Sequence, residues 1–91
     1  MHVRKILQSA RFKKDFKKVS QSGRYDIDDF ETVVSLLAQD NPLLPKHRDH
    51  KLTGNWEGFR ECHIKPDWLL IYEKPEGLLV LTRTGSHSEL F

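Results

Sequence analysis

Five polar residues in the second half of the chain have the types that carry out acid–base chemistry on a phosphate group. They are His50, His63, Asp67, Arg83 and His87. A histidine can give or take a proton near neutral pH, because its unperturbed pKa is about 6.5. An aspartate can act as a base or orient an imidazole, and an arginine can bind two phosphate oxygens at once. These types suit a reaction at phosphorus.

Cleavage of RNA without a metal needs this set of groups. A ribose 2′-hydroxyl loses its proton, attacks the adjacent phosphorus and expels the 5′-oxygen, which gains a proton. The reaction requires a base, an acid and a cation that stabilises the charge of the phosphorane. Trp68 and Phe91 have the aromatic rings that stack on unpaired bases, although a tryptophan in a strand equally suits core packing. We interpret the five residues as a candidate RNA-cleaving site.

Two other chemistries fit these residues less well. Zinc takes His, Cys and Asp ligands, but His47-x-x-His50 is the only short histidine pair and there is one cysteine. We therefore expect no metal and no other cofactor, and His47 receives no role. Cys62 and His63 are neighbours in a predicted strand, so their side chains should point to opposite faces. This parity favours a small buried residue at Cys62 over a nucleophile.

The elements that must position the site begin with one strand and two helices. Residues 3–7 predict a strand, because charged and apolar residues partly alternate there. Ser9 can cap a helix that places Phe12, Phe16 and Val19 on one face. Asp26 can cap a second helix, whose apolar residues recur every three or four positions until Asn41-Pro42 stops it. Two adjacent helices form a helical hairpin.

Three further strands are expected, at residues 56–64, 68–72 and 78–84, separated by turns at Pro66-Asp67 and Pro75-Glu76-Gly77. Residues 42–55 are expected to be a connector. The predicted fold is therefore α+β in the order β-αα-βββ, with a largely antiparallel four-stranded sheet and the helical hairpin on one side. The turn at Pro66 should bring His63 close to Asp67. If the last two strands pair, His87 leaves the sheet at the same end.

Composition and charge limit the remaining possibilities. The 91 residues suit one domain, residues 1–91, and no apolar run approaches the roughly 20 residues of a membrane span. Residues 1–9 lack the apolar centre of a signal peptide, and a single cysteine suits a reducing cytoplasm.

Residues 1–24 carry eight Lys or Arg against Asp15 alone, while residues 25–45 carry five acids and no Lys or Arg. The basic segment is either a footprint for nucleic acid or an acidic partner, or a solvated helix face.

Three motifs resemble the YafQ family of bacterial toxins, within the RelE/ParE superfamily. They are DH-x-L-x-G-x-W at residues 49–56, H-x-x-PDW at 63–68 and RTG-x-H-x-x-LF at 83–91. The resemblance is dense over residues 49–72 and 83–91, and residues 1–48 match by architecture alone. The order β-αα-βββ agrees with that superfamily.

The resemblance implies a ribosome-dependent mRNA interferase that cuts A-site codons by 2′-hydroxyl attack without metal. His50, His63, Asp67 and His87 would then be the acid–base and phosphate-contacting group. We assign Asp67 as the base and His87 as the general acid, with His50 and His63 on the phosphate and ribose. Arg83 would stabilise the transition state. The residues that would contact the RNA are Lys51, Trp68 and Phe91.

The resemblance also implies partners. A cognate antitoxin would cover the toxin and supply DNA binding, so that operator DNA is contacted only through it. The ribosome and mRNA are the other expected partners, no membrane is involved, and the basic segment would serve ribosomal RNA or an acidic antitoxin segment. Two alternatives stay open: a ParE-like inhibitor of DNA gyrase that acts by binding alone, and a small zinc-binding or RNA-binding module without catalysis.

Overall fold

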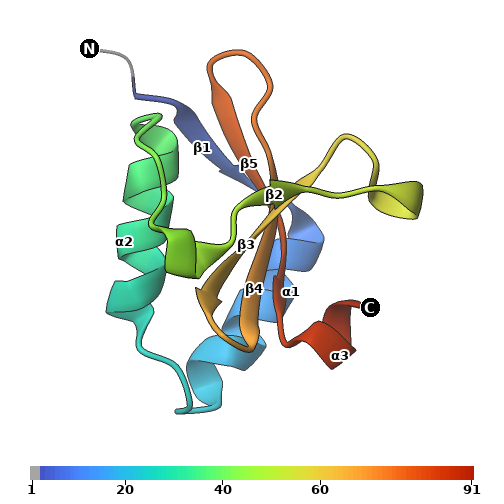
Figure 1. Cartoon of the computed structure of the whole chain (residues 1–91). Coiled ribbons are helices and arrows are strands. Elements are labelled where there is room, and N and C mark those ends of the chain that lie inside the picture. Colours follow the sequence, from blue (N-terminus) through green and yellow to red (C-terminus); the bar gives the residue numbers. More distant parts are fainter. Residues whose placement is uncertain (1–2) are drawn as a thin grey trace.

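The computed structural model describes residues 3–91 and shows a mixed five-stranded sheet with helices on both faces (Figure 1). In spatial order the strands are β1, β5, β4, β3 and β2, with β1 parallel to β5 and the other pairs antiparallel. The strands are β1 (Lys5–Gln8), β2 (His50–Lys51), β3 (Arg60–Lys65), β4 (Trp68–Glu73) and β5 (Leu78–Gly85). The helices are α1 (Ala10–Gln21), α2 (Ile27–Ala38) and α3 (His87–Leu90), with short 3₁₀ helices η1 (Pro45–His47) and η2 (Gly54–Trp56). Within residues 3–91, no helix has the length and apolar character that a bilayer crossing requires.

Helices α1 and α2 begin at the predicted capping residues. Ser9 Oγ accepts a hydrogen bond from the Phe12 N–H at 2.9 Å, and Asp26 Oδ1 accepts one from the Asp28 N–H at 2.9 Å. These acceptors satisfy N–H groups that the first helical turn leaves without a partner. Both helices pack their apolar residues on the face of the sheet formed by the even-numbered residues of β4. The predicted helical hairpin on one side of the sheet is confirmed.

The opposite face of the sheet carries a smaller apolar cluster. Leu69 and Ile71, the odd-numbered positions of β4, pack there with Leu90 of α3. The segment between β2 and β3 covers this cluster with three partly buried side chains, Leu52, Trp56 and Phe59. β4 is therefore buried on both faces, as its unbroken apolar run predicts. α3 is not predicted, because four residues are too few to show a helical period.

The α+β class is confirmed, but the prediction of four strands is wrong. β2, the fifth strand, lies within the expected connector and consists of His50 and Lys51, which pair with Glu61 and Arg60 of β3. A strand of two residues exists only through its partner, so no periodicity in the sequence reveals it.

The predicted strand over residues 56–64 begins too early. β3 starts at Arg60, and η2 occupies residues 54–56. Gly54 and Gly58 have φ values of 64° and 94°, in the left-handed region that glycine adopts at low cost. The two glycines turn the chain before β3 can extend, and the segment folds back over the smaller apolar cluster.

We expect His47 to make the stability of the fold depend on pH. The residue is 5% exposed, and its Nδ1 has no hydrogen-bond partner among residues 3–91. Burial lowers the pKa of His47, the charges of Lys46 and Lys65 lower it further, and Asp29 raises it in part. The unfolded chain therefore binds a proton at His47 more readily than the folded chain does. The contribution of His47 to the free energy of unfolding should fall as the pH drops through about 6.5, and it should be constant above that pH.

Replacing His47 with phenylalanine, which is similar in size and does not titrate, should flatten this part of the pH dependence. Urea unfolding at a series of pH values between 7.5 and 5, with wild type and His47→Phe side by side, measures the effect. Parallel curves for the two proteins would contradict the assignment.

Candidate active site

Two of the predicted histidines flank a buried glutamate on the face of the sheet opposite α1 and α2. Glu61 of β3 pairs with His50 of β2 and precedes His63 by two residues, so the three side chains share a face. Glu61 Oε1 lies 3.7 Å from His50 Nε2 and 3.4 Å from His63 Nε2. Glu61 is 5% exposed, whereas His50 is exposed and His63 partly so. The carboxylate lies beneath two imidazoles that a substrate can reach.

Backbone carbonyls orient both imidazole rings. His50 Nδ1 lies 2.6 Å from the carbonyl oxygen of Arg48, and His63 Nδ1 lies 3.2 Å from that of Pro66. A carbonyl oxygen only accepts hydrogen bonds, so we assign the Nδ1 proton to each ring. Nε2 is then the nitrogen that faces Glu61 and that can exchange a proton with a substrate.

A second polar network anchors the chain next to His50. Asp49 Oδ1 accepts hydrogen bonds from the Tyr72 hydroxyl and from Arg60 Nε, the latter at 3.3 Å. Arg60 Nη2 lies 3.3 Å from the second Asp49 carboxylate oxygen. Burial and the Asp49 carboxylate raise the pKa of Tyr72, which keeps its hydroxyl protonated and able to donate. Asp49 therefore ties the start of β2 to both β3 and β4.

The turn between β3 and β4 meets the start of α3 and brings Asp67 and His87 together. Asp67 Oδ1 accepts a hydrogen bond from the backbone N–H of His87 at 3.1 Å. This contact confirms that the chain leaves β5 at the same end of the sheet as Asp67. Both residues are exposed, and the His63 ring reaches the same turn through Pro66. Three of the five predicted residues therefore lie around one turn.

Capping interactions hold α3, which has only four residues. Ser86 Oγ accepts a hydrogen bond from the Glu89 N–H at 3.3 Å, and Glu89 Oε1 accepts one from the Ser86 N–H at 2.8 Å. The second carboxylate oxygen of Glu89 lies 2.9 Å from Lys18 Nζ on α1. These contacts, with the Ser86 N–H contributing most, lower the pKa of Glu89 to about 2. The capping box thus positions His87 and Phe91 at the two ends of α3.

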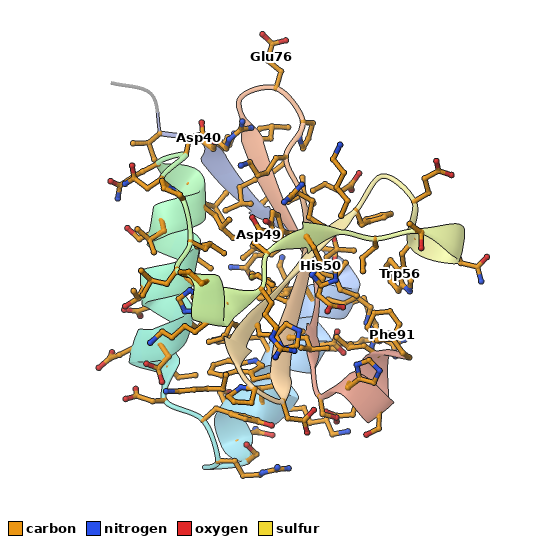
Figure 2. The ribbon with its side chains drawn as sticks, in the orientation of Figure 1. Asp40, Asp49, His50, Trp56, Glu76 and Phe91 are labelled. Carbon is orange, nitrogen blue, oxygen red and sulfur yellow. The ribbon has the colours of Figure 1, made fainter. Side chains whose placement is uncertain are left out.

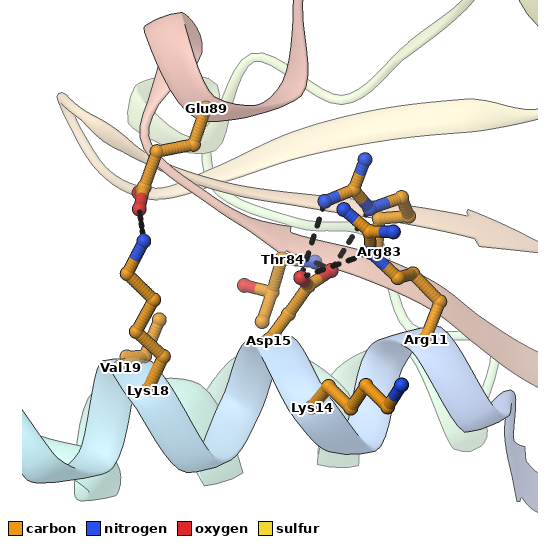
Figure 3. A pocket seen from close by; sticks show the side chains of 8 residues that line it. All are labelled: Arg11, Lys14, Asp15, Lys18, Val19, Arg83, Thr84 and Glu89. Carbon is orange, nitrogen blue, oxygen red and sulfur yellow. Dashed lines mark hydrogen bonds and ion pairs between the residues drawn. The ribbon is translucent and has the colours of Figure 1, made fainter.

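Arg83 has its partner on α1. Its Nε and Nη2 donate hydrogen bonds to the two carboxylate oxygens of Asp15, at 2.9 and 3.1 Å, and the Thr84 N–H donates to the same group at 3.3 Å. The hydrogen bonds with Asp15 raise the pKa of Arg83, so the guanidinium stays charged. The pair lines a pocket of about 390 Å³. Figure 3 shows this pocket with Lys14 and Lys18 among its lining residues. No hydrogen bond or ion pair within residues 3–91 links Arg83 to the histidines.

Trp68 does not lie where a base can stack on it, and this corrects the prediction that it contacts RNA. Its side chain is 0% exposed and belongs to the core under α2. Its ring centroid lies 4.7 Å from that of Tyr25 and 6.2 Å from that of Phe30. Its Nε1 donates a hydrogen bond to Thr84 Oγ1 at 2.9 Å. Even-numbered positions of β4 face the helices, so the side chain points into the core.

The other two residues predicted to contact RNA lie in different places. Phe91 is 51% exposed, and its ring centroid lies 5.1 Å from that of His87. Lys51 is exposed, but neighbours in a strand point to opposite faces, so its side chain turns away from His50 and lines a pocket with Phe59. Phe91 therefore lies next to His87, a predicted site residue, whereas the Lys51 side chain points away from His50.

Comparison with known proteins identifies the family. Residues 4–91 match the model of a family described as a bacterial toxin of type II toxin–antitoxin system, YafQ. The chain belongs to the YafQ family. It is 38% identical over 92 residues to the mRNA interferase toxin YafQ of Escherichia coli K12, an alignment that covers all of this chain and 99% of that protein.

Solved toxin structures share the fold of this YafQ-family chain. A copper-bound mutant toxin from Helicobacter pylori has a TM-score of 0.92 and 44% identity, with 97% of this chain and 99% of that chain covered. The YafQ toxin in the Escherichia coli DinJ-YafQ toxin–antitoxin complex has a TM-score of 0.85 and 38% identity, with 97% of each chain covered. The overall fold of this chain is therefore shared with solved toxin structures, including the YafQ toxin of that complex.

The thiol of this YafQ-family toxin is a core group. Cys62 is fully buried on the face of the sheet that α1 and α2 cover, opposite His63, as strand parity predicts. Burial raises the pKa of the Cys62 thiol, so a nucleophilic thiolate does not form there. Within residues 3–91, no group of three or more His, Cys, Asp or Glu side chains is arranged to hold a metal ion.

Sequence reasoning missed two acids of the candidate site. Glu61 shares strand parity with His63, and this signal was present, but its position beside His50 depends on the unpredicted strand β2. Asp15 stands alone among the basic residues of α1, and nothing in the sequence indicates that it pairs with Arg83 across 68 positions.

Proposed function

We propose that this YafQ-family toxin is an mRNA interferase, an endoribonuclease that cleaves RNA through attack of a ribose 2′-hydroxyl on the adjacent phosphorus. The observation that carries the proposal is the contact of Asp67 with the His87 backbone, which holds a carboxylate and an imidazole at one exposed edge. The full-length similarity to the mRNA interferase toxin YafQ supports the same reaction.

Asp67 and His87 divide the proton transfers between them. Asp67 Oδ1 accepts the His87 N–H, which leaves Oδ2 as the oxygen that takes the proton of the 2′-hydroxyl. The 2′-oxygen forms a bond to phosphorus, and the bond from phosphorus to the 5′-oxygen breaks. The His87 imidazole gives its proton to that leaving oxygen. The products are a 2′,3′-cyclic phosphate and a 5′-hydroxyl.

His50 and His63 contact the phosphate and the ribose. Their Nδ1 atoms are held by backbone carbonyls, so each ring presents Nε2 from a fixed position. Glu61 attracts both rings when they carry a second proton and thereby acts as a positioning residue.

Arg83 supplies the fixed positive charge that stabilises the phosphorane. Its bidentate pair with Asp15 uses Nε and Nη2, so Nη1 remains to donate to a phosphate oxygen. Asp15 holds the guanidinium in one orientation, which lowers the entropy lost when a phosphate binds.

The substrate is mRNA presented in the A site of the ribosome, and residues 1–91 act as a single toxin domain in the cytoplasm. The site lies at an open edge of the sheet. The ribosome presents the codon to it, so the toxin does not need a deep cleft to position the mRNA. The exposed lysines of α1 face ribosomal RNA during cleavage and an acidic antitoxin segment during inhibition. The cognate antitoxin supplies the contact with operator DNA.

A reconstituted bacterial translation reaction tests this function. The purified toxin should cut mRNA within codons only when ribosomes translate it, and primer extension locates the cuts. Placing a 2′-O-methyl group on the attacking ribose should abolish cleavage at that codon, because the nucleophile is blocked. The product downstream of the cut should carry a 5′-hydroxyl, which a polynucleotide kinase can label.

Two outcomes would contradict the proposal. Undiminished cleavage at the 2′-O-methyl codon would exclude attack by the 2′-hydroxyl. Inhibition of DNA supercoiling by purified gyrase, without any mRNA cleavage, would favour the ParE-like alternative.

A further inference from the structure

Two aromatic residues, Trp56 and Phe91, form a corner beside the proposed acid–base residues, and the proton transfers described above do not use it. The Trp56 and Phe91 ring centroids are 6.4 Å apart, with the ring planes at 71°. Phe91 also lies beside His87, at 5.1 Å and 37°. Figure 2 shows Trp56 and Phe91 on the same side of the molecule as His50. η2 and the end of α3 are far apart in the chain, yet they place Trp56 and Phe91 on one surface next to His87.

Trp56 is placed differently from Trp68. Trp68 is fully buried and its Nε1 is hydrogen-bonded, as its place in the main core requires. Trp56 is only partly buried at the margin of the smaller cluster, with Phe59 packed edge-on at 5.3 Å and 87°. Part of Trp56 therefore packs against the smaller cluster, and part stays accessible beside the half-exposed residue Phe91.

We infer that Trp56 and Phe91 form a stacking subsite for one unpaired nucleobase of the mRNA, and that Trp56 is a substrate-positioning residue. The inference rests on the proposed function. The rings are nearly perpendicular, so a base that stacks on the face of one ring turns its edge toward the face of the other, and both contacts are favourable for aromatic groups. A nucleobase is a flat aromatic group and can make both of these contacts at once.

The position of the corner selects which base is bound. His87 donates its proton to the leaving 5′-oxygen, and Phe91 lies directly beside that imidazole. The nucleotide that carries the leaving oxygen is therefore the one whose base lies nearest the corner. Stacking fixes this nucleotide while the bond to phosphorus breaks, so the subsite acts on the base that follows the cut.

Synthetic mRNAs that lack one base test the inference on programmed ribosomes. With wild-type toxin, removing the base after the cut should lower kcat/KM by about 10- to 100-fold, the usual value of one stacked base. Trp56→Leu, which keeps an apolar side chain at the edge of the cluster, should lower kcat/KM on intact mRNA by a similar factor. When the variant and the base removal are combined, kcat/KM should fall little further than with either change alone, because both remove the same contact. Trp56→Phe should restore most of the activity.

Control measurements separate the possible outcomes. Phe59→Leu alters the other aromatic neighbour of Trp56, which is not part of the proposed subsite, and it should leave the response to the missing base unchanged. Melting temperatures of the variants show whether each one is folded. If Trp56→Leu lowered kcat/KM by the same factor on mRNA without the base as on intact mRNA, the two effects would be independent. Trp56 would then have a packing role alone, and the inference would be overturned. Normal cleavage by Trp56→Leu together with weaker antitoxin binding would assign the corner to the antitoxin, which also overturns it. If wild type cleaves no mRNA at all, the proposed function itself fails.

Discussion

Asp67→Asn is expected to lower kcat for mRNA cleavage by about 10²- to 10⁴-fold, the usual contribution of a general base. An asparagine side chain retains an oxygen that can accept the His87 N–H, so the turn and α3 should keep their positions. The amide cannot take the proton of the 2′-hydroxyl. Single-turnover cleavage on programmed ribosomes measures the rate, and thermal unfolding measures whether the fold is kept.

The comparison with Asp67→Ala sharpens this test. Alanine removes both the base and the hydrogen bond to His87, so it should lower kcat at least as much and also lower the melting temperature. If Asp67→Asn cleaved at the wild-type rate, Asp67 would be a structural residue and the base would have to be another group. His63 is then the nearest candidate, because its ring reaches the same turn.

Trp68→Ala is expected to cost about 3–5 kcal/mol of unfolding free energy, as large-to-small changes at fully buried aromatic residues do. Its ring fills the space between β4 and α2 against Tyr25 and Phe30. A domain of this size has a total stability of about 5–15 kcal/mol, so the variant should be partly unfolded near 37 °C. Urea unfolding gives the free energy directly.

Trp68→Phe distinguishes a core role from a role in RNA binding. It keeps an aromatic ring and loses the Nε1 hydrogen bond to Thr84, whose hydroxyl still donates to the Leu69 carbonyl oxygen at 2.7 Å. We expect a modest loss of stability and an unchanged kcat and KM at 25 °C. A folded Trp68→Phe protein with a kcat/KM lowered by 100-fold would show that the indole contacts the substrate.

Local rules were sufficient to predict the helices α1 and α2 and the central strand β4. Capping by Ser9 and Asp26 and the spacing of apolar residues depend on neighbours within a few positions, so a sequence alone reveals them. The same holds for the burial of β4, which follows from an unbroken apolar run. β2 and α3 are too short to show any period, and their existence depends on β3 and on the Ser86–Glu89 capping box.

Within the candidate site, the sequence by itself determined the residue types: three histidines, an aspartate and an arginine, which are groups that the proposed reaction at phosphorus needs. Only the tertiary structure decided how these residues are grouped. It placed Glu61 between two histidines, held Arg83 on Asp15, and put Trp56 rather than Trp68 beside Phe91. The physical reason is that residue type sets what a side chain can do, whereas its face, burial and partners come from strand pairing and helix packing between segments far apart in the chain.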